Sequence, residues 1–234
     1  MCRHNRLYPR RVRLGKLFIL ALIIISSPGC TYYFGSSWFK KAPAYRNSDP
    51  MPFSTELRER TEKTNYQKHP LIQYFADKNL RGWSIKDKSG TPRVMLAKMA
   101  LKQDIQRVNE FLLVSEAWGI SGSTSPYFKK GDYDFTQIIL CSVLHLFGED
   151  KTLLWPKTRD HLLNVLLLEE GGKPDLKTPR TMRIMRDTEN HILMTEITRY
   201  LKNQWLKNHG SKEEKHDNSR NGLEKWFRSH LKEM

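Results

Sequence analysis

The chain has 234 residues and a formal net charge of +15, a length that suits one ordinary domain with a sizeable core. It has three cysteines, no low-complexity tract and no tandem repeat. Cys2 lies in the export signal and Cys30 is the predicted lipid-attachment site, both described next, so Cys141 has no partner and an internal disulfide is excluded. We expect Cys141 to be a small core residue.

The N-terminus is typical of an export signal over residues 1–29. Residues 1–16 carry six Arg and Lys and no acid, and residues 17–25 are all apolar. As a helix, the apolar run would span only ~14 Å, about half of a bilayer core, which disfavours a membrane span. Cys30 resembles the lipid-attachment cysteine of bacterial lipoproteins. We predict a lipid-anchored protein of the bacterial cell envelope; a signal or anchor without lipid and an unexported chain are the alternatives.

The predicted mature chain stays basic. Removing residues 1–29 takes away six positive charges and no negative ones, so the net charge falls to +9 (15 − 6). In the envelope, the available polyanions are acidic polysaccharides, lipid head groups and cell-wall polymers, and a solvated surface without a polyanion site is the alternative. The Lys and Arg residues are scattered and do not lie on a helix suited to reading nucleic-acid bases, so we predict no nucleic-acid partner.

The remaining chain divides at about residue 92. Residues 30–91 predict a tether and an irregular arm, because aromatic residues mix there with Gly, Ser and Pro without an apolar period. Residues 65–80 could form a short helix. Residues 92–234 predict a domain of helical hairpins.

Five helices are expected in this domain. An apolar stripe indicates the first, over residues 95–117. The second, after Asp134 as its N-cap, is apolar on most of its circumference and should be deeply buried. The third starts near Pro156 and ends at Gly171-Gly172. The fourth begins near Thr188, and the last, ending at residue 234, is amphipathic. With no alternating strand, the sequence predicts an all-α fold.

Two stretches resemble a family of exported bacterial proteins of (α/α) toroid type. These are FTQIILCSVLHLFGEDKTLLWPKTRDHLLNVLL and RDTENHILMTEITRYLKNQ, within residues 133–206. The resemblance implies the six-hairpin architecture of polysaccharide lyases and several glycoside hydrolases. Because a complete toroid needs about ten to twelve helices, we expect an incomplete toroid from a truncated or split reading frame; an intact small helical domain is the alternative.

Glu189, Asn190 and His191 stand side by side where the fourth helix begins. Thr188 or Asp187 can cap that helix, and the helix dipole favours a carboxylate at Glu189. Helical spacing places Asn190 on the apolar side of the helix. The trio is therefore either chiefly a helix start or the lining of a substrate cleft.

The resemblance gives these residues a chemical role. In toroidal lyases, helix starts face the cleft, and β-elimination needs the uronate carboxylate neutralised and its C5 proton removed. Asn190, with Arg183 or Arg186, would neutralise that carboxylate, and His191 would transfer the C5 proton. A glycoside hydrolase would instead use two carboxylates, for which Asp187 and Glu189 are candidates.

No cofactor or metal is predicted. His, Cys, Asp and Glu never stand at ligand spacing, and Walker, dinucleotide and nucleophile-elbow motifs are missing from the sequence. Whether the chain is an enzyme stays open, with two hypotheses. One is a domain that binds or acts on acidic polysaccharide, and the other is a non-catalytic structural or interaction lipoprotein.

Overall fold

The computed structural model describes residues 69–127, 129–173, 175–180 and 183–233. The predicted signal and the lipid-attachment site at Cys30 lie outside these residues. The chain divides into two units, and every described helix and strand belongs to the second, Pro70–Met234. None of the helices in the described part is long and apolar enough to cross a membrane.

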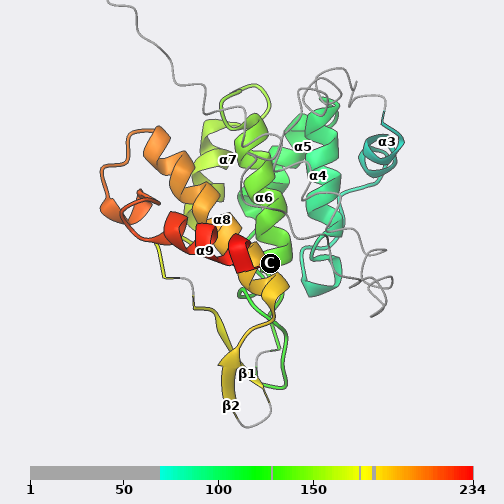
Figure 1. The fold of residues 1–234 in the computed structure, drawn as a ribbon. Helices are drawn as coiled ribbons and strands as arrows, with labels where there is room; N and C mark the ends of the chain where they lie inside the picture. The colour runs from blue at the N-terminus through cyan, green and yellow to red at the C-terminus, as the bar shows by residue number, and fades with distance from the viewer. Residues whose placement is uncertain (1–68, 128, 174, 181–182, 234) are drawn as a thin grey trace, which may run out of the picture. The chain divides into compact units, whose positions relative to one another are not determined.

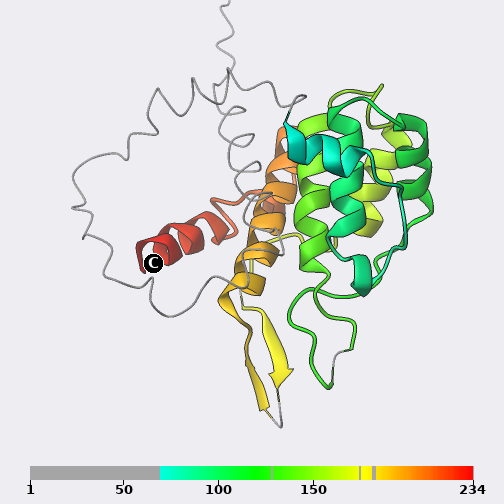
Figure 2. The ribbon, with the colours of Figure 1, turned by 90° about the vertical axis from the view of Figure 1, so that its right-hand side faces the viewer.

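The second unit is rich in helices (Figures 1 and 2). Its α-helices are α3 (Pro70–Ala76), α4 (Gly90–Ala100), α5 (Ile105–Val114), α6 (Asp134–Phe147), α7 (Pro156–His161), α8 (Glu189–Asn208) and α9 (Leu223–Glu233). Short 3-10 turns are η3 (Ile85–Asp87) and η5 (Glu214–His216), and a π-helical turn, η4 (Leu162–Leu166), follows α7. Its one described sheet pairs β1 (Lys177–Arg180) with β2 (Arg183–Arg186). The helical fold is confirmed at this coarse level.

Helix α6 lies at the centre of the unit, between α4 and α8 (Figure 1). Its side chains from Thr136 to Leu144 are all buried, and Cys141 is a free thiol among them, as predicted. Burial of these apolar side chains is the main driving force for this packing. Helix α6 ends before Gly148, where an added Cβ would lie 2.6 Å from the Trp205 ring of α8. A glycine here allows the two helices to approach closely.

The first predicted helix is two helices. A turn at residues 101–104 separates α4 from α5, and Lys102 and Asp104 in it have φ values of 56° and 48°. The apolar stripe was real, since Val108 and Leu112 are fully buried. Left-handed residues end a helix without changing the apolar spacing, so the period alone could not reveal the break.

The strand pair was not predicted. The segment between the third and fourth predicted helices forms an antiparallel ribbon in which Lys177 pairs with Arg186 and Arg180 with Arg183. Four-residue strands are too short to show alternation when both faces carry basic residues. We call β1 and β2 the β ribbon. It extends beyond the helices of its unit, beside the loop that precedes α6 (Figures 1 and 2).

The buried face of α8 is not the face of Asn190, which the apolar spacing predicted to be buried. His191, Thr195, Thr198 and Lys202 are buried, whereas Asn190 is exposed and Ile197 is only partly covered. The prediction followed the most apolar stripe and was wrong by about one residue around the helix. Buried polar side chains are tolerated where partners from other segments satisfy them, as Leu167 O does by accepting from Lys202 Nζ at 2.6 Å.

Candidate functional site

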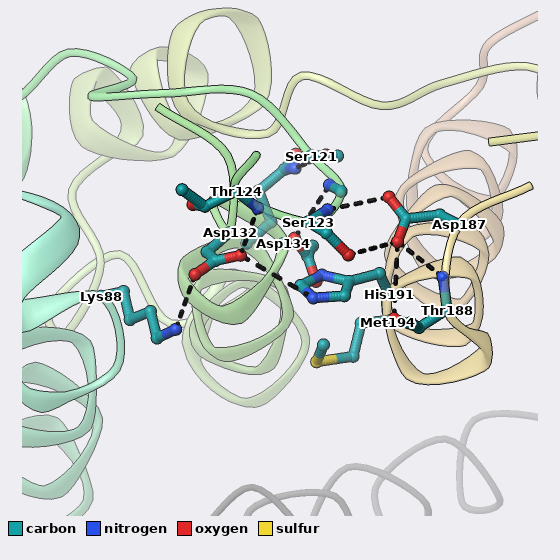
Figure 3. A network of polar contacts seen from close by, with 12 residues as sticks. Lys88, Ser121, Ser123, Thr124, Asp132, Asp134, Asp187, Thr188, His191 and Met194 are labelled. Carbon is teal, nitrogen blue, oxygen red and sulfur yellow. Dashed lines mark hydrogen bonds and ion pairs between the residues drawn. The ribbon is translucent and has the colours of Figure 1, made fainter. Parts of the chain in front are cut away.

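His191, at the start of α8, lies between two carboxylates from the start of α6. Its Nδ1 is 2.9 Å from Asp134 Oδ2, and its Nε2 is 3.7 Å from Asp132 Oδ1 (Figure 3). The Asp134 side chain is fully buried, and His191 is 7% exposed. Asp134 thus fixes the orientation of the ring, and Nε2 is the nitrogen turned toward Asp132.

The loop before α6 places both carboxylates. Ile120 N donates to Lys130 O at 2.8 Å, and Asp132 N donates to Gly122 O at 2.6 Å, which closes the loop on itself. Gly122 N in turn donates to Asp134 Oδ1 at 3.1 Å. Tyr133 is the N-cap residue and Asp134 is the first helical residue, so the predicted capping role of Asp134 is wrong by one position. Its carboxylate serves the loop and His191 instead.

Lys88 completes this group from the segment before α4. Its Nζ lies 2.8 Å from Asp132 Oδ2 and 4.4 Å from the centre of the Phe135 ring. The Phe135 ring meets His191 edge-on at 5.4 Å. We call His191, Asp132, Asp134 and Lys88 the His191 cluster. Its more open side is that of Lys88 and Asp132, whose side chains are 35% and 15% exposed.

Asp187 anchors the β ribbon and the start of α8 to the same loop. Its carboxylate accepts from Ser123 N at 2.8 Å, from Thr188 N at 2.6 Å, and from the hydroxyls of Ser123 and Thr178. Thr188 is the N-cap residue, as predicted, but its own side chain makes no capping hydrogen bond. At the start of α8 it is therefore the Asp187 carboxylate, and not the Thr188 hydroxyl, that accepts a backbone hydrogen bond.

The charges of the cluster shift its pKa values. Burial acts to lower the pKa of His191, but the hydrogen bond and charge of Asp134, with the charges of Asp187 and Asp132, raise it overall. Burial acts to raise the pKa of Asp132, yet hydrogen bonds from Lys88 and Thr124 N outweigh it and lower the pKa. The pKa of Asp187 is held far below its usual range, because its hydrogen bonds outweigh burial. His191 therefore stays cationic to a higher pH than a free histidine, whose pKa is about 6.5.

Such an arrangement can hold or move a proton at Nε2. A histidine whose Nδ1 is held by a buried carboxylate has a fixed tautomer when neutral, which prepares Nε2 to accept a proton. It can equally be a structural ion pair that joins the loop before α6 to α8. No group of three or more His, Cys, Asp or Glu in the described residues could hold a metal ion.

Of the predicted trio, only His191 enters the cluster. Asn190 and Glu189 are exposed, and Glu189 Oε1 lies 3.5 Å from His230 Nε2 of α9. The predicted shielding of Asn190 is therefore wrong. Arg183 and Arg186 are exposed on β2, and Arg183 is at the strand end remote from α8.

Asp187 is poorly suited to be the acid of a glycoside hydrolase. A glycosidase needs one carboxyl group with a raised pKa, and the hydrogen bonds that Asp187 accepts do the opposite. The carboxylates that do face a reactive group, Asp132 and Asp134, were missed as site residues. Their only sequence signal is the pair of acids two residues apart in Gly-Asp-Tyr-Asp, directly before an apolar helix.

Comparison with known protein families, curated proteins and solved structures gives no significant match for this chain. The resemblance to toroid-type proteins therefore stays a prediction, and the site is interpreted from its own geometry.

Proposed function

We propose that this chain is an exported, lipid-anchored envelope protein whose helical unit is part of a carbohydrate-active toroid and acts on acidic polysaccharide. The observation that carries the proposal is the oriented imidazole, with His191 Nδ1 held 2.9 Å from the buried Asp134. The export signal, the lipid anchor and the toroid rest on the sequence patterns alone. The site chemistry rests on the His191 cluster.

In the proposed reaction, His191 is the base of a β-elimination. Asn190, exposed next to it, donates hydrogen bonds to the uronate carboxylate and so acidifies the C5 proton. Neutral His191 takes that proton on Nε2, the C4–oxygen bond breaks, and the leaving oxygen gains a proton from water. The sugar approaches from the Lys88 side, and Arg186 adds positive charge close to α8.

This mechanism fixes the pH dependence. The base must be neutral, and the pKa of His191 is raised by Asp134 and the other acids. Turnover should therefore rise as the pH passes upward through the folded-state pKa of His191, above pH 6.5. An Asp134→Asn variant should move this limb to lower pH, since the carboxylate that stabilises the imidazolium is gone.

The test is turnover of polyuronates and glycosaminoglycans by the purified chain, followed through the ultraviolet absorbance of the unsaturated product. Asn190→Ala is the informative variant, because an exposed polar side chain contributes little to stability and its loss would affect activity alone. We expect a drop of about a hundredfold or more, within the range of one positioned catalytic interaction. No product with any of these polymers would remove the lyase proposal.

The burial of His191 supports a second candidate function, a non-catalytic interaction lipoprotein. With carboxylates near both ring nitrogens and 7% exposure, the cluster would serve to hold the loop before α6 against α8. This candidate predicts that His191→Ala lowers stability and that Asn190→Ala changes neither stability nor polysaccharide binding. Calorimetric titration with the same polymers separates the two functions.

A further inference from the structure

The β ribbon places like charges opposite each other. Lys177 lies opposite Arg186 across the strands. Directly opposed like charges destabilise a strand pair, and a two-stranded ribbon has little other stabilisation. All four side chains of β2 are exposed. The ribbon thus carries a concentration of positive charge that its own fold does not need.

Among the described residues, few acids pair with the cations of the ribbon. Lys177 Nζ pairs with Asp175 at 2.9 Å. Within the described residues, neither Arg183 nor Arg186 forms an ion pair. The two guanidinium groups are free to meet an external anion.

Apolar side chains lie between these arginines. Ile184 is 72% exposed and Met185 is 50% exposed, so they are among the most exposed large apolar residues described. Because neighbouring strand residues point to opposite faces, Ile184 shares its face with Arg186, and Met185 shares the other with Arg183. Each face of β2 therefore combines one cation with one apolar side chain.

This combination distinguishes between possible anionic partners. A soluble polyanion would pair with the arginines but would leave Ile184 and Met185 in water. An anionic bilayer surface can meet both needs, since head-group phosphates contact the cations and the acyl boundary takes up the apolar side chains. We propose that the β ribbon binds anionic phospholipid at a membrane surface.

The binding site comprises Lys177 and residues Arg183 to Arg186. Its position beyond the helices (Figures 1 and 2) lets it reach a surface without rearranging the core. Since each cation near an anionic surface contributes about 1 kcal/mol, losing one should weaken binding roughly fivefold. The interaction should weaken as salt is added. It requires no turnover and goes beyond the proposed action on polysaccharide.

The test is hydrogen–deuterium exchange of residues 177–186 in the full-length chain, with vesicles of phosphatidylglycerol and phosphatidylcholine or of phosphatidylcholine alone. A local readout is needed because the N-terminal segment could bring the chain to vesicles by itself. We expect protection of the ribbon amides only with phosphatidylglycerol. Arg183→Glu removes a positive charge and adds a negative one, so it should weaken protection by more than fivefold, and Ile184→Asp should also weaken it. The matched reversal Arg220→Glu, at a cation that is 70% exposed in the loop before α9, should leave it unchanged.

Several results would overturn the proposal. Equal protection by neutral vesicles would show that anionic lipid is not required. Protection by soluble alginate that Ile184→Asp leaves intact would assign the ribbon to polysaccharide. Unchanged protection in the Arg183→Glu variant would show that this cation of the β ribbon takes no part in binding. Ile184 lies outside the His191 cluster and has no role in the proposed substrate site, so turnover by the Ile184→Asp variant reports separately on the proposed enzyme function.

Discussion

His191 joins the start of α8 to the start of α6. It is held by Asp134 and faces Asp132, and its pKa is raised because the acids outweigh the effect of burial. A raised histidine pKa means that the folded state binds the proton more tightly. The stabilisation is thus complete below pH 6.5 and is lost as the pH rises through the folded-state pKa.

Replacing His191 with Ala should therefore destabilise the protein in a pH-dependent way. At pH 6 the variant should lose about 3 kcal/mol, because the buried Asp134 is left without its charge partner. At pH 8.5 the loss should be smaller. Urea unfolding at both pH values measures the difference. Asn190→Ala, its exposed neighbour, is the control and should stay within about 0.5 kcal/mol of wild type.

Glu196 is a second buried ionisable residue on α8, and its environment is unfavourable. Its side chain is fully buried and neither carboxylate oxygen has a hydrogen-bond partner. Arg199 Nη1 lies 3.4 Å away, within ion-pair distance but outside hydrogen-bond geometry. Burial outweighs the attraction of Arg199 and raises the pKa of Glu196 to about 7. The folded state thus favours the neutral acid.

Glu196→Gln should stabilise the protein above neutral pH. Unfolded Glu releases its proton near pH 4.5, whereas folded Glu196 keeps it to about pH 7, so wild type loses stability across that interval. Gln carries no charge to bury, and the gain at pH 8 should approach about 3 kcal/mol and vanish near pH 4.5. Thermal unfolding at the two pH values checks this, and an equal change at both would refute the charge argument.

At the scale of elements, the loop before α6 depends on one glycine. Gly122 has φ +95°, and an added Cβ would lie 2.8 Å from Asp187 Oδ2 and 3.0 Å from Thr178 Oγ1. It stands where the loop, the β ribbon and the start of α8 meet. Gly210 has nearly the same φ, +94°, with no atom within 4 Å of the added Cβ. A comparison of the two glycines therefore separates the free-energy cost of a left-handed backbone from the cost of close packing.

Gly122→Ala should therefore cost more than Gly210→Ala. The left-handed conformation alone costs about 1 kcal/mol in either variant. At Gly122 the displaced Asp187 carboxylate should add at least as much again, and the ribbon amides should exchange faster. Equal losses of stability would show that the contact between loop and ribbon is loose.

At the scale of the whole molecule, the buried groups set an acidic optimum of stability. The raised pKa of Glu196 reduces stability as the pH rises from about 4.5 to about 7, and the raised pKa of His191 reduces it further above pH 6.5. The lowered pKa values of Glu170 and Asp187 reduce it in strong acid. His145, whose pKa is lowered chiefly by burial, opposes the first trend below pH 6.5.

We therefore expect the free energy of unfolding to be greatest between about pH 5 and 6.5, at the acidic end of the usual range. Urea titrations from pH 4 to 9 would locate the maximum. In the Glu196→Gln variant the maximum should move to higher pH. A wild-type optimum at pH 8 would contradict the buried, neutral state of Glu196.

Several local features could be predicted from the amino-acid sequence alone. The apolar circumference of α6 predicted its burial, Pro156 marked the start of α7, and Thr188 with Glu189 marked the start of α8. These signals act within a few residues, through side-chain periodicity, fixed proline φ and the helix dipole. They could be read without knowing what packs against what.

The candidate site, in contrast, could be recognised only in the folded protein. His191 and Asp134 are 57 residues apart, and their contact depends on a loop closed by its own backbone hydrogen bonds and on Asp132 at φ 70°. The choice of α8 face also lay beyond the sequence, because a buried histidine or lysine is acceptable only when distant segments supply its partners. A polar residue's burial is decided by those partners, and no local pattern records them.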